Sequence, residues 1–273
     1  MGAGMTDETA GQTGGVDLTR PSAARVYDYY LGGAHNFAVD REMAERAIGL
    51  WPDLPLIMQQ NRAFLRRAVR FCVDAGIRQF LDLGSGIPTV GNVHEVAQDA
   101  APESRVVYVD NDPVAAAYSE NILRGNDRAG VVQADLRRPD EVLASPGVRA
   151  LLDLDEPVAV MMVAVLHFVP DSDDPAAIIA KYREVMAPGS YLVLSHASQD
   201  GQPDQADSHQ DLYQRTATPM TMRSREQVTG LFDGFEVVEP GVVFFPEWRP
   251  VSPEDVDDHP ERFTGLAAVG RKA

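Results

Sequence analysis

The chain has 273 residues, of which 44% are hydrophobic and 24% are charged, and its formal net charge is −17. A chain of this length buries enough surface to fold as one large domain without a disulfide or a structural metal. Because an acidic surface repels phosphate backbones and anionic lipid, we expect neither a nucleic acid nor a membrane as partner. The single cysteine, Cys72, excludes an intrachain disulfide and a cysteine zinc cluster.

Lysine is almost absent, and this excludes two classes of phosphate-handling protein. Only Lys181 and Lys272 are present, and neither is followed by serine or threonine as a phosphate-loop lysine is. Neither stands in the Val-Ala-Ile-Lys sequence of a protein kinase.

The first part of the chain predicts a tail followed by helices. Residues 1–18 are rich in Gly and Thr, and we expect them to form a disordered tail. They have neither the positive start nor the apolar stretch of a signal peptide, so we expect the protein in the cytoplasm. Helical periodicity then covers Pro21–Leu31, Asp40–Leu50 and Leu56–Ala75, with Gly32-Gly33 as a stop after the first helix. Residues 19–75 are therefore predicted to form an N-terminal helical cap.

From Gly76 onward, short apolar runs alternate with helical stretches. Such alternation, with strands that are apolar throughout, predicts an α/β domain over residues 76–273 whose parallel sheet is covered by helices. The predicted strands are Gln79–Leu83, Arg105–Asp110, Gly130–Ala134, Val158–Val165, Tyr191–Ser195, Val237–Val238, Val242–Phe245 and Leu266–Val269. The helices between them are predicted at Gly91–Ala100, Pro113–Arg124, Asp140–Leu152 and Pro175–Met186.

One segment, Gln199–Arg223, interrupts this alternation. It is polar, carries four aspartates and is predicted to be irregular. It ends at Ser224-Arg-Glu-Gln227, a capping-box sequence that predicts the start of another helix. We expect the segment to close the acceptor side of a binding site, where its aspartates disfavour an anionic molecule.

The most informative stretch is Phe80–Thr89, an apolar strand followed by Gly84-Ser85-Gly86 and a helix start. Glycines let a ligand approach the backbone amides at the start of a helix. A dinucleotide fingerprint has a third glycine where this chain has Thr89, and it rarely has an acid at the position of Asp82. A carboxylate there repels a pyrophosphate but attracts an ammonium or a sulfonium. S-adenosylmethionine (SAM) carries both cations and no phosphate, so the turn favours SAM over NAD.

Polar residues follow the next three strands as well. Asp110, at the tip of the second strand, is placed to accept hydrogen bonds from two ribose hydroxyls. After the third strand, Asp135 and the amide of Leu136 can hold the edge of an adenine. His167 follows the fourth strand, at the carboxyl edge of the sheet where ligands bind in this architecture.

These residues lie within a wider resemblance. Five stretches resemble the successive motifs of class I SAM-dependent methyltransferases: Phe80–Thr89, Val107–Asp112, Ala134–Leu136, Val165–Phe168 and Ala187–Leu194. Three more resemble a bacterial family of SAM-dependent methyltransferases whose substrates are largely undefined: Pro21–Gly33, Gln60–Leu65 and Pro88–Glu95. The resemblance begins at about Pro21 and covers nearly the whole chain. It implies a Rossmann-like, mostly parallel sheet of seven strands in the order 3-2-1-4-5-7-6, with an antiparallel seventh strand and helices on both faces.

The resemblance also implies roles for single residues. It assigns the methionine part of SAM to the glycine turn, the ribose to Asp110 and the adenine to Asp135 with Leu136. Arg62 is the matching candidate for the SAM carboxylate, although Arg66 and Arg70 at helical spacing fit a solvated stripe equally well. The full predicted cofactor set is Tyr30, Asn36, Arg62, Asp82, Gly84, Ser85, Gly86, Asp110, Asn111, Asp135, Leu136 and Ala164.

Several of these assignments have alternatives. Asp82 fits a helix cap as well as a ligand contact, and Asp110 fits a strand-end carboxylate that starts the next helix. Tyr27, Tyr30 and Asn36 fit a lid over SAM or plain packing. His167 is the candidate general base, since histidine titrates near neutral pH, but it fits a pocket wall too. His94-Glu95 lacks the second histidine of a metalloprotease helix because Gln98 stands there, so we expect no metal.

The sequence thus predicts methyl transfer from SAM to a small-molecule acceptor, with S-adenosylhomocysteine (SAH) as the product. A non-catalytic SAM-binding sensor or partner protein uses the same cofactor residues and stays open. An NAD(P)-dependent oxidoreductase is less consistent with Asp82 and Thr89.

Overall fold

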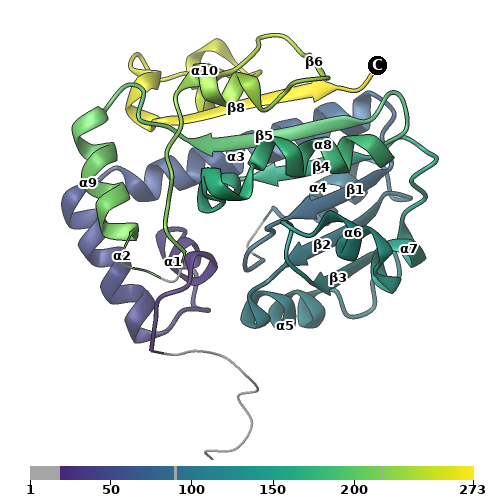
Figure 1. The fold of residues 1–273 in the computed structure, drawn as a ribbon, viewed down its shortest axis with the longest axis horizontal. Helices are drawn as coiled ribbons and strands as arrows, with labels where there is room; N and C mark the ends of the chain where they lie inside the picture. Colours follow the sequence, from purple (N-terminus) through teal and green to yellow (C-terminus); the bar gives the residue numbers. More distant parts are fainter. Residues whose placement is uncertain (1–18, 89–90, 215, 217) are drawn as a thin grey trace, which may run out of the picture.

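The computed structural model describes residues 19–88, 91–214, 216 and 218–273. The predicted tail at 1–18 and the fingerprint position Thr89 therefore lie outside the described residues. Helices cover both faces of one mixed sheet (Figure 1). None of the helices in the described ranges is both long enough and apolar enough to cross a lipid bilayer.

The sheet has eight strands, and its main path runs β3-β2-β1-β4-β5-β8-β6. The first five strands are parallel, and β8 runs antiparallel to β5. The strands are β1 (Gln79–Leu83), β2 (Arg105–Asp110), β3 (Ala129–Gln133), β4 (Ala159–Val163), β5 (Tyr191–Ala197), β6 (Glu236–Val237), β7 (Val243–Phe244) and β8 (Gly265–Arg271). The order that the resemblance implies is confirmed. The resemblance implies seven strands, whereas the sheet has eight, as many as the apolar runs in the sequence predict. The last two short strands pair with opposite ends of β8, so β7 does not lie on the main path.

The α-helices in chain order are α1 (Ala23–Tyr30), α2 (Ala38–Leu50), α3 (Leu54–Asp74), α4 (Val93–Ala100), α5 (Pro113–Ile122), α6 (Pro139–Ala144), α7 (Pro146–Leu151), α8 (Pro175–Val185), α9 (Pro203–Tyr213) and α10 (Arg225–Gly230). The predicted single helix at Asp140–Leu152 is two helices. Ser145 has extended backbone angles, because a residue before proline disfavours the helical region, and its hydroxyl caps α7. The capping box predicted at Ser224 is confirmed at the start of α10.

The central strands are apolar throughout because both faces of the sheet are buried. Alternate residues such as Phe80 and Met161 join one hydrophobic cluster with α1, α2, α3 and α4. Their neighbours, such as Leu81 and Met162, join a second cluster with α6, α7, α8 and α10. A strand that alternates between two cores cannot show the polar–apolar pattern of a half-exposed strand. This explains why the parallel strands were predicted with only small errors at their ends.

The segment Gln199–Arg223 is not irregular throughout, and that prediction is wrong. It contains α9, which lies beside α2 (Figure 1). Only Ala206, His209 and Tyr213 on this helix are buried, at spacings of three and four residues that define one narrow face. Apart from Pro203 and the half-buried Leu212, the remaining residues are polar, including Asp204, Asp207 and Asp211, so the overall composition hides the amphipathic pattern.

The predicted N-terminal cap shares its core with the rest of the molecule. Val26 of α1, Ala44 of α2 and Phe64 of α3 belong to the same buried cluster as Phe80 and Met161 of the sheet. The start of α1 is fixed by Asp40, whose carboxylate is completely buried. It accepts hydrogen bonds from Arg25 Nε at 2.9 Å, Ser22 N at 3.0 Å and Phe37 N at 2.9 Å.

We predict that Asp40→Ala lowers the free energy of unfolding by about 3–5 kcal/mol, because the buried Arg25 guanidinium then loses its main anionic partner. Denaturant titration measures the change. Glu45→Ala is the matched control on α2, since this carboxylate makes an exposed contact with the Tyr29 hydroxyl, and we expect a change within about 1 kcal/mol. Equal effects of the two substitutions would contradict a structural role for the Asp40 cluster.

Candidate functional site

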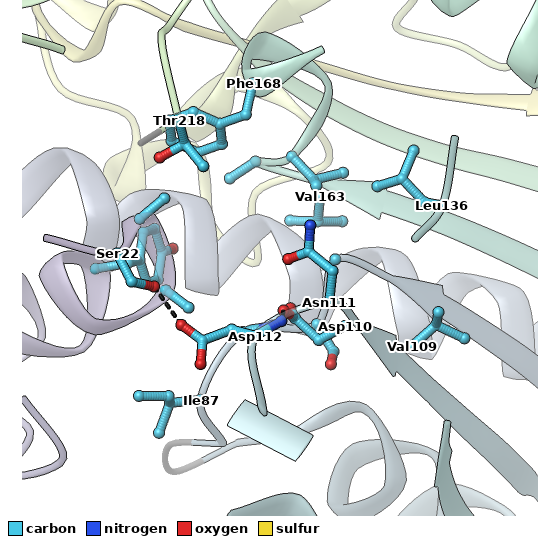
Figure 2. Close-up of a pocket in the computed structure, with 18 of the residues that line it drawn as sticks. Ser22, Ile87, Val109, Asp110, Asn111, Asp112, Leu136, Val163, Phe168 and Thr218 are labelled. Atoms are coloured by element: carbon cyan, nitrogen blue, oxygen red, sulfur yellow. Dashed lines mark hydrogen bonds between the residues drawn. The ribbon is translucent and has the colours of Figure 1, made fainter. Parts of the chain in front are cut away.

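A cleft of about 590 Å³ opens at the carboxyl ends of β1, β2 and β4. The loops after these strands form one wall, and the start of α1 together with Thr218 and Pro219 forms the other. Figure 2 shows Asp110, Asn111 and Asp112 grouped at the tip of β2, with Ser22, the residue before α1, facing Asp112. Leu136 and Val163 lie above this group, and Phe168 lies beside Thr218 at the far end. The cleft volume is within the range of about 300–1,000 Å³ that small-molecule sites have.

The glycine turn is fixed by close packing and by main-chain hydrogen bonds. Gly84 has φ +71°, and a Cβ built on it would lie 2.1 Å from the side chain of Val165. Its amide donates to the Val109 carbonyl at 2.7 Å. Gly86 has φ +66°, with nothing within 4 Å of a Cβ position. The first glycine is thus required by the protein itself, whereas the second leaves open space for a ligand.

Two buried carboxylates lie behind this turn. The pKa of Asp82 is raised to about 7, mainly by burial; the charge of Arg62 opposes the shift, and the Asp110 carboxylate adds to it. Burial likewise raises the pKa of Asp110 to about 6, against the lowering effect of the Asp112 and Gly86 amides. A cation placed beside these carboxylates offsets the cost of their burial. The electrostatics of the turn therefore favour a positively charged ligand over a phosphate.

Asp110 joins the turn to the tip of β2. Its Oδ2 accepts the Gly86 amide at 2.8 Å, and its Oδ1 accepts the Asp112 amide at 2.9 Å. Each oxygen keeps lone-pair capacity for a further hydrogen bond. The alternative that Asp110 starts the next helix is wrong, because Asp112 is the N-cap of α5 and accepts the Val114 amide at 2.8 Å.

Asp112 also anchors α1 across the cleft. Its carboxylate accepts a short hydrogen bond from the Ser22 hydroxyl, and Arg25 Nη1 lies 3.8 Å from the same oxygen. No pattern in the sequence linked Ser22 to Asp112, which are 90 residues apart. The cleft is therefore closed on one side by α1, a helix that the sequence predicts only as part of the N-terminal helical cap.

Arg62 extends from α3 into the cleft, where its Nη2 donates to the Gly91 carbonyl at 3.0 Å. Its Nε is buried without a hydrogen-bond partner in the described part of the chain. Arg70, two turns along the same helix, is exposed and pairs with Asp99 at 3.3 Å. The arginines predicted as one stripe thus have different surroundings, and among them only Arg62 is a lining residue of the cleft in the described part of the chain.

Asp135 lines the cleft from the loop after β3, together with Leu136. Arg137 holds its carboxylate through Nη2 at 2.6 Å and also pairs with Asp173 at 2.9 Å. Burial acts to raise the pKa of Asp135, but the hydrogen bonds and charge of Arg137 outweigh it and hold the pKa below the usual value. Asp135 is therefore ionised and oriented before any ligand binds.

Some of the remaining predicted cofactor residues line the cleft, and others lie elsewhere. Ser85, Asn111 and Ala164 line the cleft, and the Ser85 hydroxyl is buried without a hydrogen-bond partner in the residues that the structure describes. Asn36 is not among the described residues that line the cleft; its side-chain amide donates to Asp28 at 2.8 Å and stabilises the turn after α1. Tyr30 is buried and lines a second, smaller cavity. We call this second cavity the inner chamber.

The inner chamber has a volume of about 50 Å³ and meets the cleft at Ala164, Phe168 and Tyr27, which line both. Ala164 has φ +56°, a left-handed conformation that costs energy for any residue except glycine. Its amide donates to the Ser195 hydroxyl at 2.9 Å, and that hydroxyl donates to Asn61 Oδ1 at 2.6 Å. The chain that separates the two cavities is therefore fixed by buried hydrogen bonds.

His167, the predicted general base, lines the inner chamber and not the cleft. Burial lowers its pKa well below the usual value, with smaller contributions from His196, His209 and Arg223. Its Nδ1 accepts the Ala197 amide at 3.3 Å, which puts the ring proton of the neutral imidazole on Nε2. His94 is paired with the Tyr108 hydroxyl at 2.7 Å, a structural contact between α4 and β2.

Comparison with known proteins identifies the family. Residues 9–273 match the family model described as S-adenosyl methyltransferase. The chain belongs to the S-adenosyl methyltransferase family. Its enzymatic class is SAM-dependent methyltransferase, and its cofactor is SAM. A search of curated proteins gave no match.

Two solved structures are similar over nearly their whole length. One is a candidate methyltransferase from Thermobifida fusca, 40% identical, with a TM-score of 0.89 over 94% of this chain and 96% of that one. The other is a DUF574 family protein from Streptomyces avermitilis, 39% identical, with a TM-score of 0.89 over 93% of this chain and 98% of that one. A more distant N-methyltransferase from Bradyrhizobium japonicum, solved with SAH, shares the fold alone at 14% identity and a TM-score of 0.50, over 91% of this chain and 98% of that one.

The cleft of this methyltransferase fits its cofactor. SAM supplies a methyl group on a sulfonium, which is transferred to a nucleophile. The molecule carries two cations and one carboxylate, and the cleft offers two buried carboxylates and one buried guanidinium nitrogen without a partner, from Asp82, Asp110 and Arg62. The open space beside Gly86 completes a backbone surface that a ligand can approach closely.

Because the pKa of Asp82 is raised in the folded protein, the free energy of unfolding should depend on pH. An aspartate in the unfolded chain has a pKa of ~4, so between pH ~4 and about 7 the folded apoprotein holds a proton that the unfolded chain releases. The contribution of this group to stability therefore decreases as the pH rises through that window. We expect Asp82→Asn to raise the free energy of unfolding by roughly 2–4 kcal/mol at pH 8 and by much less at pH 5.

Denaturant titrations of the two proteins at both pH values, without cofactor, measure this difference. Asp127→Asn is the matched control, because Asp127 is exposed, and we expect no pH-dependent gain from it. If Asp82→Asn gave the same gain at pH 5 as at pH 8, Asp82 would be ionised over the whole range.

Proposed function

We propose that the protein methylates a small-molecule acceptor, with SAM in the cleft and the acceptor entering from the inner chamber. The observation that supports catalysis is the junction of the two cavities at Ala164. A sensor needs only a site for the cofactor, whereas methyl transfer needs a second site in line with the sulfonium. The acidic surface disfavours nucleic acid as the acceptor, and we propose the cytoplasm as the location of the protein.

The cofactor residues have distinct proposed roles. Asp110 accepts the ribose hydroxyls through the free lone pairs of its two oxygens. Leu136 covers the adenine, and Asp135 accepts from its amino group. Arg62 binds the carboxylate of the methionine part, and Asp82 faces one of the two cations. Asn111 and Val163, both at the centre of the cleft in Figure 2, give the cofactor its remaining contacts.

The contacts of α1 with the loop after β2 put this helix beside the proposed binding site. The hydrogen bond from Ser22 to Asp112 and the contact of Arg25 with the same carboxylate hold α1 against the loop after β2. Water is then excluded from one side of the cleft, which strengthens the electrostatic contacts inside it. His167 lies close to the junction of the cavities and remains a proposed pocket residue on the acceptor side.

The role of Asp110 is tested by calorimetry. We expect SAM and SAH to bind, and NAD to bind far more weakly because its pyrophosphate meets two buried carboxylates. Asp110→Ala should lose roughly 1.5–3 kcal/mol of SAH binding, the range for a hydrogen bond to a charged group, while the exposed Asp127→Ala should lose none. Tighter binding of NAD than of SAH would contradict the assignment of the cleft.

The role of Arg62 is tested in the same assay. Arg62→Met keeps the aliphatic part of the side chain and removes the charge, so we expect SAH to bind roughly 10- to 100-fold more weakly. Arg70→Met on the same helix is the control, because Arg70 pairs with Asp99 at the surface, and its SAH affinity should stay at the wild-type value. Equal affinities in the two variants would place the SAM carboxylate elsewhere.

Catalysis itself is tested by turnover. Purified protein with SAM and fractionated small molecules from cells should form SAH, and the mass of the acceptor should rise by one methyl group. Binding of SAM without SAH formation for any fraction would favour the sensor over the enzyme.

A further inference from the structure

Two side chains that line the inner chamber carry buried polar atoms without a partner among the described residues. Trp51 at the end of α2 and His209 of α9 are both 3% exposed. Neither the indole Nε1 of Trp51 nor either ring nitrogen of His209 has a hydrogen-bond partner in the part of the chain that the structure describes. Buried polar atoms without partners are rare in folded proteins, because each one carries the cost of its lost hydration. Trp51 and His209 both line the inner chamber, and a ligand bound there can satisfy these nitrogens.

The geometry around these atoms is that of an aromatic enclosure. The rings of Trp51 and His209 are perpendicular, with centroids 5.8 Å apart. His209 lies against Tyr213, centroid to centroid at 4.9 Å, and Tyr213 lies 5.9 Å from Phe168. Phe168 lines both the chamber and the cleft. An aromatic surface thus continues from the buried histidine to the place where the cofactor cleft begins.

The chamber has no charged side chain to match an ionic ligand. Among the described residues that line it there is no aspartate, glutamate, lysine or arginine. Burial lowers the pKa of His209 to about 4, so this ring is neutral at physiological pH. His167 is neutral as well, since burial lowers its pKa well below the usual value. A carboxylate or phosphate in the chamber would be buried without a counter-charge, which is strongly unfavourable.

We propose that the inner chamber is the acceptor subsite and that it selects an uncharged aromatic molecule with a hydroxyl or N–H group, which donates a hydrogen bond to His209. This proposal rests on the proposed function and adds the substrate class and the residue that recognises it. The Trp51 indole N–H donates to an acceptor atom of the same molecule. His209 is a binding residue in this arrangement, and no proton transfer is assigned to it.

The size of the chamber limits how the molecule lies. A cavity of ~150 Å³ holds a benzene ring, and the inner chamber has about 50 Å³. Only the end of the molecule that carries the hydrogen-bonding group therefore fits inside. The rest of the ring extends past Phe168 and Ala164 toward the cleft, which brings the opposite end of the molecule to the cofactor.

His209 is better placed than His167 for this recognition. The Nδ1 of His167 already accepts the Ala197 amide, so only its Nε2 proton is available to a ligand. His196 is also engaged, with Nδ1 at 2.7 Å from the Ala197 carbonyl and Nε2 at 2.8 Å from Arg223. His209 can accept with one nitrogen and donate with the other, because both are unpartnered among the described residues.

The test uses phenol, toluene, benzoate and benzyltrimethylammonium as probes. Their dissociation constants are measured by ligand-observed NMR with the full-length protein, with and without saturating SAH. We expect phenol to bind, toluene to bind more weakly, and benzoate not to bind. His209→Leu should weaken phenol binding at least tenfold and leave toluene binding unchanged, because leucine keeps the apolar wall and removes both nitrogens. Asp207→Leu, on the exposed face of the same helix, is the control and should change neither.

A thermal melt accompanies the binding data. Replacing a buried polar group that has no partner by an apolar one is neutral or stabilising, so His209→Leu should melt at the same temperature as the wild type or higher. Weaker phenol binding together with undiminished stability separates recognition from a structural role. If phenol bound His209→Leu as tightly as the wild type, or if benzoate bound better than phenol, the proposal would be overturned. Preferential binding of benzyltrimethylammonium would overturn it too, in favour of a cation held by the rings.

The outcomes for the acceptor subsite and for the cofactor are distinguishable. Failure of SAH to bind counts against the proposed function, and the phenol measurement without SAH still decides whether the chamber selects neutral aromatic molecules. Normal SAH binding with no phenol binding in either condition overturns the acceptor subsite alone.

Discussion

The Asp110 carboxylate is the interaction on which the architecture of the site depends. It receives the amide of the glycine turn after β1 and the amide of Asp112 after β2, so it joins the two loops that form the cleft. Asp112, held in place by this contact, caps α5 and accepts the Ser22 hydroxyl from α1. A single buried group thus couples the sheet edge, the next helix and the N-terminal helix that closes the cleft.

The burial of the carboxylates in the cleft also lowers the stability of the folded protein. Asp82 and Asp110 are held where water does not solvate their charges, and their pKa values rise to about 7 and about 6 as a result. The left-handed Ala164 and the unpartnered nitrogens of Trp51 and His209 carry further costs. These costs are concentrated around the two connected cavities, which is where binding free energy can offset them. These features therefore lie around the two cavities in which we propose that ligands bind.

Much of the fold and of the cofactor cleft could be read from local patterns. Gly84, Asp82 and Asp110 were found because a glycine turn and a strand-end acid have fixed positions in a strand–turn–helix unit, and parallel strands end at one edge of a sheet. Arg62 needed the resemblance, because its spacing to Arg66 and Arg70 predicts only a solvated stripe. His209 and Trp51 could not be found, since α9 shows just one narrow buried face within a polar segment. The resemblance puts Asn36 at the cofactor, whereas its side chain stabilises the turn after α1 through Asp28.

The sequence by itself determined the α/β class and the preference of the cleft for a cation, because each depends on the chemistry of residues that are neighbours in the chain. The strand order came from the resemblance to a known family. Only the tertiary structure decided which distant residues meet. Ser22 with Asp112, Asn61 with Ser195, and Trp51 with His209 are contacts between elements far apart in sequence. Such contacts arise where whole elements pack together, as α2 packs with α9 and α3 packs with the sheet. Packing is set by the shapes of whole surfaces rather than by any local pattern. The residues of the cofactor cleft can therefore largely be predicted from local sequence patterns. The residues of the inner chamber cannot, because they come together only through tertiary packing.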